Sequence, residues 1–399
     1  MSFTYNGDGR LAQVRDAHSR ILFLRYTNDS LVQAYDSTYH SVSYVQANGN
    51  LAGVAGLDGS NWLYEYDNLH RLLKVTNPVG VKIVQNTYND FDRVIAQFAP
   101  RDTGMETYKM HYGGFVASEE DPEGNRTTYH FDLDGRRVAM EDALHNTSRM
   151  AYDGQGNVIS QTDPRNNLST FVYDGFGNLK EQINGRGEKV TFAYDMQHRL
   201  VEATSPLNQK VTYKHNAKHR ITDRTDPLGH TVKTTYLANG LVNTLTDPRA
   251  INMVYSYDAN GNVDTTQTST NPVINWNYDI RGNLESLVDQ KGAKTSFVYY
   301  NNGLLKERLD PLGKKSLYEY TAAGEVKKST DRNNKSTQFS YSASGKLKGI
   351  SYPGSAVNFH YDARDNLVEM IDPTGTTTNT YDGAGRLTGH TDSNGHSVG

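Results

Sequence analysis

Tyrosines recur along most of this chain at an interval of 21 residues, and each opens a stretch reading roughly Tyr-Asp-x-x-Gly-Asn-Leu. A period of this size is typical of a repeat architecture, in which each unit packs on its neighbours. We therefore expect residues 1–399 to form one continuous repeat array without a separate catalytic domain. The clearest repeats are predicted at 131–395 and degenerate units near 91–114.

The tyrosine series begins at Phe131 and has His215 in place of one tyrosine. Towards the N-terminus it passes Met110, Tyr88 and Tyr66 to an ill-defined unit near Tyr44. Its clear members are Tyr152, Tyr173, Tyr194, Tyr236, Tyr257, Tyr278, Tyr299, Tyr320, Tyr341, Tyr361 and Tyr381.

One repeat can be interpreted from its local chemistry. Residues 170–174 alternate between two kinds of side chain, as in a strand with two different faces. Asp174-Gly-Phe-Gly-Asn178 is turn sequence, because glycine supplies positive φ and Asp and Asn bond their own backbone. A second strand follows at 179–183, and many repeats then carry an Asp-Pro turn such as Asp163-Pro164. Each repeat is therefore predicted to be one β-hairpin, and the fold class all-β.

An isolated hairpin is marginally stable, so the hairpins should pair edge to edge into one long, twisted and coiled sheet. In this arrangement we expect the rings of neighbouring repeats, such as Tyr173 and Tyr194, to stack directly on one another. The structural residues predicted beside the tyrosine ladder are the turn glycines Gly156, Gly177, Gly261 and Gly282 and the apolar ladder Leu179, Leu200, Leu284, Leu305 and Leu347.

Composition excludes several classes of function. The formal net charge of -4 provides no basic surface for nucleic acid. No apolar run of 18 residues is present to span a membrane, and the N-terminus has no apolar core of a secretory signal. The absence of cysteine rules out disulfides and thiol chemistry.

Three patterns that suggest specific chemistry are better explained by turns. Asp153 and Asp163 could be a glycosidase pair, but such aspartates recur in unit after unit, whereas catalytic pairs are singular. His215 and His219 have metal-ligand spacing only on a helix, and Asp258 begins no complete calcium loop. We predict no catalytic residue, metal or cofactor.

The repeat core resembles the YD-repeat, or Rhs-repeat, family. The residues that carry the resemblance are Tyr152-Asp-Gly-Gln-Gly-Asn-Val, Tyr173-Asp-Gly-Phe-Gly-Asn-Leu, Tyr257-Asp-Ala-Asn-Gly-Asn-Val and Tyr278-Asp-Ile-Arg-Gly-Asn-Leu, with the Asp-Pro-Leu-Gly turns at Asp226 and Asp310. Members include bacterial Rhs and wall-associated polymorphic toxins, cocoon-forming components of Tc toxins, and the YD shell of teneurins. The resemblance implies a β-strip coiled into a hollow shell, which in the bacterial toxins holds an effector.

The resemblance leads to two functional hypotheses. The first is a non-enzymatic shell segment, secreted or at the cell surface of a bacterium, that encloses or displays an effector polypeptide or joins other shell segments. The alternative is an extracellular adhesion or carbohydrate-binding module that uses exposed tyrosine rows. The chain begins and ends within a repeat, so we expect it to be a segment of a longer shell. Its free strand edges also predict edge-to-edge self-association.

Overall fold

The computed structural model describes residues 1–16, 20–38 and 40–399, and in these ranges it contains strands and turns but no helix. The described strands are β1 (Ser2–Tyr5), β2 (Leu11–Arg15), β3 (Ile21–Thr27), β4 (Ser30–Asp36), β5 (Ser41–Ala47), β6 (Asn50–Ala55), β7 (Asn61–Tyr66), β8 (Leu72–Thr76), β9 (Lys82–Tyr88), β10 (Val94–Arg101), β11 (Gly104–Gly113), β12 (Val116–Glu120), β13 (Arg126–Phe131), β14 (Arg137–Glu141), β15 (Thr147–Tyr152), β16 (Val158–Thr162), β17 (Leu168–Tyr173), β18 (Leu179–Ile183), β19 (Lys189–Tyr194), β20 (Leu200–Thr204), β21 (Lys210–His215), β22 (Ile221–Thr225), β23 (Thr231–Tyr236), β24 (Val242–Thr246), β25 (Asn252–Tyr257), β26 (Val263–Thr268), β27 (Asn271–Tyr278), β28 (Leu284–Val288), β29 (Lys294–Tyr299), β30 (Leu305–Leu309), β31 (Lys315–Tyr320), β32 (Val326–Thr330), β33 (Ser336–Tyr341), β34 (Leu347–Tyr352), β35 (Ser355–Tyr361), β36 (Leu367–Asp372), β37 (Gly375–Tyr381), β38 (Leu387–Thr391) and β39 (Ser397–Val398).

Each strand pairs antiparallel with the next along the chain, so the strands form one continuous meander from β1 to β39. The predicted all-β class and the tandem hairpins are confirmed. Two kinds of turn alternate along the strip. We call the turn after an odd-numbered strand a first turn (for example Asp174–Asn178) and the turn after an even-numbered strand a second turn (for example Asp163–Asn167). In a meander, all first turns lie along one edge of the strip and all second turns along the other.

A β-bulge recurs at the tyrosine position of the repeats. Val172 pairs with Glu181 but Tyr173 pairs with Leu179, so the second strand carries one extra residue at this point. The same shift is found in the hairpins that begin with β15, β19, β21, β23 and β25. Because a bulge bends its strand and increases the local twist, repeated bulges on one edge provide a physical reason for the strip to curve.

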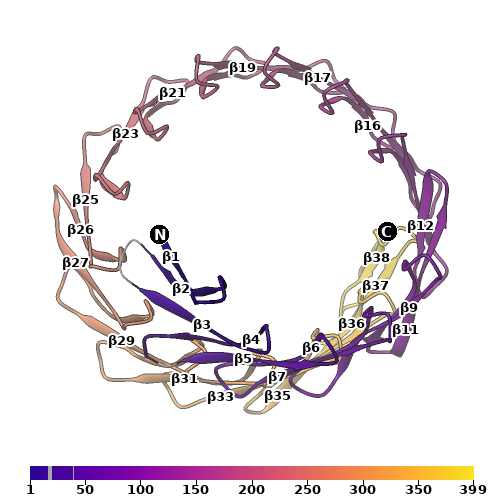
Figure 1. Ribbon diagram of the computed structural model, residues 1–399. Coiled ribbons are helices and arrows are strands. Elements are labelled where there is room, and N and C mark those ends of the chain that lie inside the picture. Colours follow the sequence, from indigo (N-terminus) through magenta and orange to yellow (C-terminus); the bar gives the residue numbers. More distant parts are fainter. Residues whose placement is uncertain (17–19, 39) are drawn as a thin grey trace.

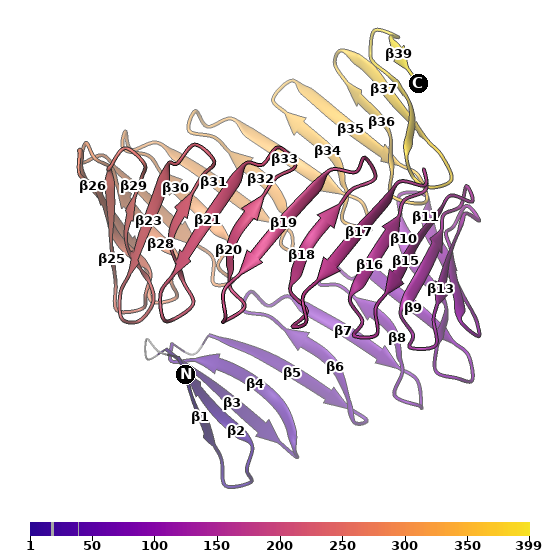
Figure 2. The ribbon, with the colours of Figure 1, turned by 90° about the horizontal axis from the view of Figure 1, so that it is seen from above.

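The strip coils into a ring in the view of Figure 1, and the C-terminal strands from β29 onward run past the N-terminal strands. Figure 2, at right angles to this view, shows that the two ends of the strip lie at different levels. The sheet is therefore an open spiral of somewhat more than one turn.

The wall of this spiral is a single layer of sheet. A compact protein of this mass would expose about 15,600 Å², whereas this chain exposes 23946 Å². Among the described residues, Ala99 is the single buried hydrophobic residue and no side chain is completely buried. The protein has no conventional hydrophobic core, so its stability must come from ladder pairing, half-buried side chains and turn contacts.

Candidate functional site

The turn aspartates are engaged by their own loops. The backbone N–H groups of Phe176 and Asn178 both donate to Asp174 Oδ1 at 2.9 Å, and Asn178 Nδ2 donates to Asp174 Oδ2 at 2.9 Å. The backbone closes the same loop, because Gly177 N–H donates to the Asp174 carbonyl at 3.1 Å. The hydrogen bond from the Asn178 side chain, followed by those from the backbone N–H groups of Asn178 and Phe176, holds the pKa of the Asp174 carboxyl below its usual value.

The second turns repeat this geometry at the opposite edge of the strip. Asp163 accepts from the backbone N–H groups of Arg165 at 2.9 Å and Asn167 at 2.8 Å. Asp153 and Asp163 lie at opposite ends of the five-residue strand β16, so roughly 16 Å separates them. Glycosidase pairs are about 5–10 Å apart. Both carboxylates are therefore placed as turn caps and do not face one another.

The predicted turn glycines occupy the left-handed backbone region, at φ 88° for Gly156, 84° for Gly177, 82° for Gly261 and 86° for Gly282. Glycine adopts this conformation without steric cost. Other residues take the same position in some turns, as at Asn166 (φ 62°) and Ala250 (φ 64°).

The two histidines of the rejected metal pair have separate structural positions. His219 occupies the left-handed turn position at φ 62°, and His215 pairs with Ile221 as the tyrosines pair with leucine. Among the described residues, no group of three or more His, Cys, Asp or Glu side chains is placed to hold a metal ion. No helix in the described ranges is long and apolar enough to cross a membrane.

The ladder tyrosines make one recurring hydrogen bond. The Tyr173 hydroxyl donates to the Val158 carbonyl at 3.0 Å, fifteen residues back, at the start of the second strand of the preceding repeat. The same bond is made by Tyr152, Tyr194, Tyr236, Tyr257, Tyr299, Tyr320 and Tyr341. Tyr361 and Tyr381 reach back fourteen residues to Leu347 and Leu367. Each tyrosine thus links its own hairpin to the preceding one.

Two expectations about the ladder need correction. Equivalent tyrosines such as Tyr173 and Tyr194 lie two strands apart with β18 between them, a separation of roughly 10 Å. Tyrosine and leucine positions alternate from strand to strand along this edge, so the tyrosine rings cannot stack directly on one another. Near 91–114, Tyr112 makes the tyrosine bond, to the Val94 carbonyl at 2.9 Å, in place of Met110. The long strands β10 and β11 shift the pattern there, so the 21-residue count misses the correct residue.

Replacing Tyr257 by phenylalanine should lower the free energy of unfolding by about 1 kcal/mol, because the 2.7 Å bond to the Val242 carbonyl is lost. Urea denaturation followed by circular dichroism measures the change. Tyr278→Phe is the matched control. Tyr278 has the same position in its repeat, but among the described residues its hydroxyl has no hydrogen-bond partner. Equal losses in the two variants would contradict the structural role of the hydroxyl bond.

A seam forms where the second turns of the first coil meet the first turns of the next coil. Asn302 Nδ2 donates to Asp58 Oδ2 at 2.7 Å, across 244 positions of sequence. Lys348 Nζ lies 2.7 Å from Asp102 Oδ1, across 246 positions. With repeats of 21 residues, 244/21 places between eleven and twelve repeats in one coil.

Ion pairs also join the two coils farther along this seam. Arg364 Nε lies 3.0 Å from Glu123 Oε2, and Arg364 NH1 lies 3.7 Å from Asp121 Oδ2. Arg101 Nε lies 3.2 Å from Asp365 Oδ2. The Arg364 side chain is only 12% exposed, which makes this pair less screened by solvent than an ordinary surface pair.

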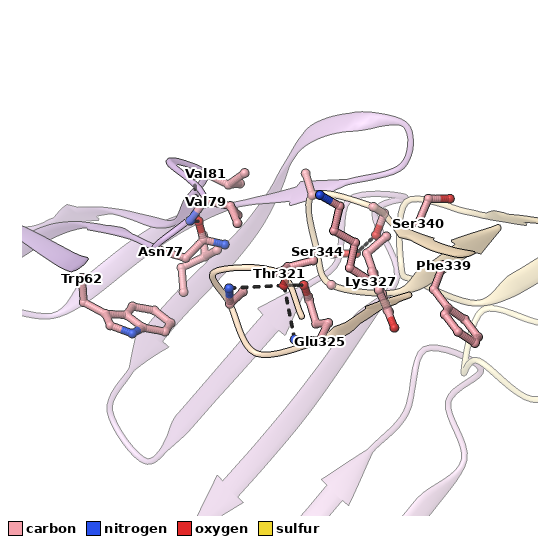
Figure 3. Close-up of a pocket in the computed structure, with 16 residues that line it drawn as sticks. Trp62, Asn77, Val79, Val81, Thr321, Glu325, Lys327, Phe339, Ser340 and Ser344 are labelled. Carbon is pink, nitrogen blue, oxygen red and sulfur yellow. Dashed lines mark hydrogen bonds between the residues drawn. The ribbon is translucent and has the colours of Figure 1, made fainter. Parts of the chain in front are cut away.

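Hollows lie along the seam between neighbouring first turns. Figure 3 shows one of about 670 Å³, where Val79 of one coil lies opposite Thr321 and Ser344 of the next coil. Trp62 lines the same hollow from the first coil. A second hollow, of about 350 Å³, lies between the first turns at Asn302 and Thr321 and receives Asp58. The seam therefore joins second-turn tips to the gaps between first turns.

The RHS Repeat family profile matches residues 47–82, 152–189, 173–210, 194–231 and 361–397. The chain contains RHS repeats. The structure places each matched segment in the same hairpin strip, and a comparison with curated protein sequences finds no significant match.

Solved structures share the fold of this RHS-repeat chain. The crystal structure of TcdB2-TccC3-Cdc42 matches it with a TM-score of 0.70 at 15% identity. The Photorhabdus luminescens Tc holotoxin pore with a mutated TccC3 gives the same values, and TcdB2-TccC3-TEV gives 0.69 at 15%. Each match covers 97% of this chain and 23% of the other, so this RHS-repeat chain spans about a quarter of those chains.

The sequence predicts the RHS hairpins but not the seam. The tyrosine ring is half-buried, and in most repeats its hydroxyl is bonded to a backbone carbonyl. Glycan binding by these tyrosine rows therefore stays a prediction. The seam has one sequence signal. First turns from 301 onward carry small or polar tips, whereas several earlier first turns carry Leu, Ile, Met or Phe.

Proposed function

We propose that this chain is part of the wall of a secreted or cell-surface bacterial toxin shell that encloses a partner polypeptide. The observation that carries the proposal is the single-layer sheet, exposed on both faces and coiled past one full turn. A wall of this kind has an inner face available to a second polypeptide, and its continuous backbone pairing resists proteolysis. The likeness of the fold to structures that contain TcdB2 and TccC3 supports a place in a toxin complex.

The residues that support this role are architectural. The tyrosine bonds, the capped turns and the seam together hold the wall closed, and we propose that residues 1–399 act as one continuous array without a catalytic domain. The effector polypeptide, or a neighbouring shell segment, is the proposed partner.

The test starts from the native polypeptide purified from its source. We expect an intact mass well above that of this chain, or a second polypeptide that stays bound until denaturation. The enclosed polypeptide, whether it is part of the same longer chain or a second chain, is the associated segment. It should resist trypsin in the native state and be cleaved once urea has unfolded the wall. A native protein without any associated segment, or with one that trypsin removes equally fast before and after urea, would overturn the proposal.

A further inference from the structure

The two edges of the strip differ in chemistry outside the seam. We call the edge of first turns the first rim and the edge of second turns the second rim. Several first-rim turns that lie outside the seam present large apolar side chains, 61–99% exposed, at Leu69, Phe91, Leu133, Phe176, Met196 and Ile280. First turns inside the seam present Asn302, Ala322, Ala323, Ala343, Ser344, Ala363, Arg364, Gly383 and Ala384. Large apolar tips are thus confined to the part of the rim that the seam does not cover.

The seam shows how a first rim is covered. In it, a second-turn tip such as Asp58 or Val79 faces the hollow between two adjacent first turns. An equivalent hollow of about 650 Å³ lies on the uncovered first rim, between the turns at Asp174 and Asp195. Its lining is more apolar, with Phe176, Met196 and Phe192 around its mouth and wall.

The second rim supplies tips of matching character. Leu207, Leu228 and Leu312 each occupy the third position of a second turn and are 79%, 81% and 75% exposed. This is the turn position that Val79 has in the seam. A leucine is a larger apolar group than valine, and burying it in an apolar hollow removes more apolar surface from water.

We propose that two copies of this chain associate rim to rim, with leucine-tipped second turns of one copy entering first-rim hollows of the other. The interface would continue the geometry of the internal seam from one molecule to the next. Because the two rims are different surfaces, the contact is head to tail and leaves a free rim at each end of the assembly. This inference goes beyond the enclosure of a polypeptide and concerns the rims alone.

Sedimentation velocity over a range of protein concentrations tests the proposal. The unaltered chain should associate, and either Phe176→Ser/Met196→Ser on the first rim or Leu207→Ser/Leu228→Ser on the second should weaken association by roughly tenfold or more. Val298→Ser is the matched control. Val298 is 49% exposed within β29 and belongs to no turn of either rim, so its replacement should leave association unchanged. Circular dichroism checks that all variants keep the fold.

Mixing the two double variants provides a second, sharper measurement. The first-rim variant keeps an intact second rim and the second-rim variant an intact first rim, so the mixture should form dimers and stop there. A chain that stays monomeric at every concentration would overturn the proposal, as would association that neither double variant weakens. This experiment measures association between copies and not the protection of a bound polypeptide. Failure of the rim-to-rim proposal can therefore be distinguished from failure of the proposed function.

Discussion

Replacing Arg364 by alanine is expected to open the seam and lower the free energy of unfolding by roughly 2–4 kcal/mol. The change removes both seam ion pairs of this largely buried guanidinium, to Glu123 and Asp121, and leaves those carboxylates without their cation. The coil should relax, because Arg364 joins a first turn of one coil to a second turn of the other. Urea denaturation measures the loss of stability, and small-angle scattering measures the expansion.

The Arg281→Ala variant is the control that distinguishes the effect of contacts across the seam from the effect of contacts within the repeats. Both arginines hold the third position of a first turn, and both lie near the aspartate of their own turn, at 3.8 Å for Arg281 and 3.9 Å for Arg364. Each also donates to a backbone carbonyl of the next first turn, at 2.7 Å and 3.0 Å respectively. Since Arg281 has no described partner across the seam, its loss should cost less and leave the scattering profile unchanged. Equal expansion of both variants would show that the seam does not hold the coil closed.

Acid is expected to unfold the protein cooperatively as the pH falls from about 4 towards 2. Hydrogen bonds from neighbouring side chains and backbone N–H groups hold the pKa values of many turn aspartates below their ordinary value, namely Asp132, Asp153, Asp163, Asp174, Asp195, Asp247, Asp310, Asp331, Asp372, Asp382 and Asp392. For Asp195, the side-chain bond from Arg199 is the largest cause and lowers the pKa to about 2.

The direction in which stability changes with pH follows from these lowered pKa values. A carboxylate whose pKa is lower in the folded state stabilises the fold above its unfolded pKa, and this contribution is lost as the pH falls through the folded pKa. The urea midpoint should therefore be nearly constant between pH 7 and pH 5 and fall steeply below pH 4.

Asparagine substitution isolates the contribution of the carboxylates. Asn184 already caps a turn with two backbone N–H groups donating to its Oδ1 at 3.0 Å, so an amide can preserve this geometry. A variant with Asp153, Asp163, Asp174 and Asp195 replaced by Asn should fold and show a shallower loss of stability below pH 4. An unchanged acid profile in that variant would contradict the assignment of the effect to these turns.

The hairpins were predictable because their signals are local. Asp174 and Gly177 specify a turn within five residues, and Tyr173 marks the strand end beside it. The acceptor of the tyrosine hydroxyl was not predictable, because Val158 belongs to the preceding repeat and is bonded through its backbone carbonyl. Any residue type could provide that carbonyl.

The seam could not be predicted for a different reason. Arg364 and Glu123 meet because small bends and twists add up over more than eleven hairpins, and a slight change in each would bring other turns together. The residue type at position 364 does not indicate how these bends and twists accumulate. The ill-defined unit near Tyr44 has a local cause instead, because the bulge there places Gln46 opposite Leu51 at the tyrosine position.

The order of pairing also has a kinetic consequence. Every strand of the meander pairs with its sequence neighbours, so its contacts are local and can form as soon as each hairpin exists. The Asp58–Asn302 contact must instead close a loop of 244 residues. During synthesis from the N-terminus, the first coil can therefore be complete as a sheet while it is still open as a ring.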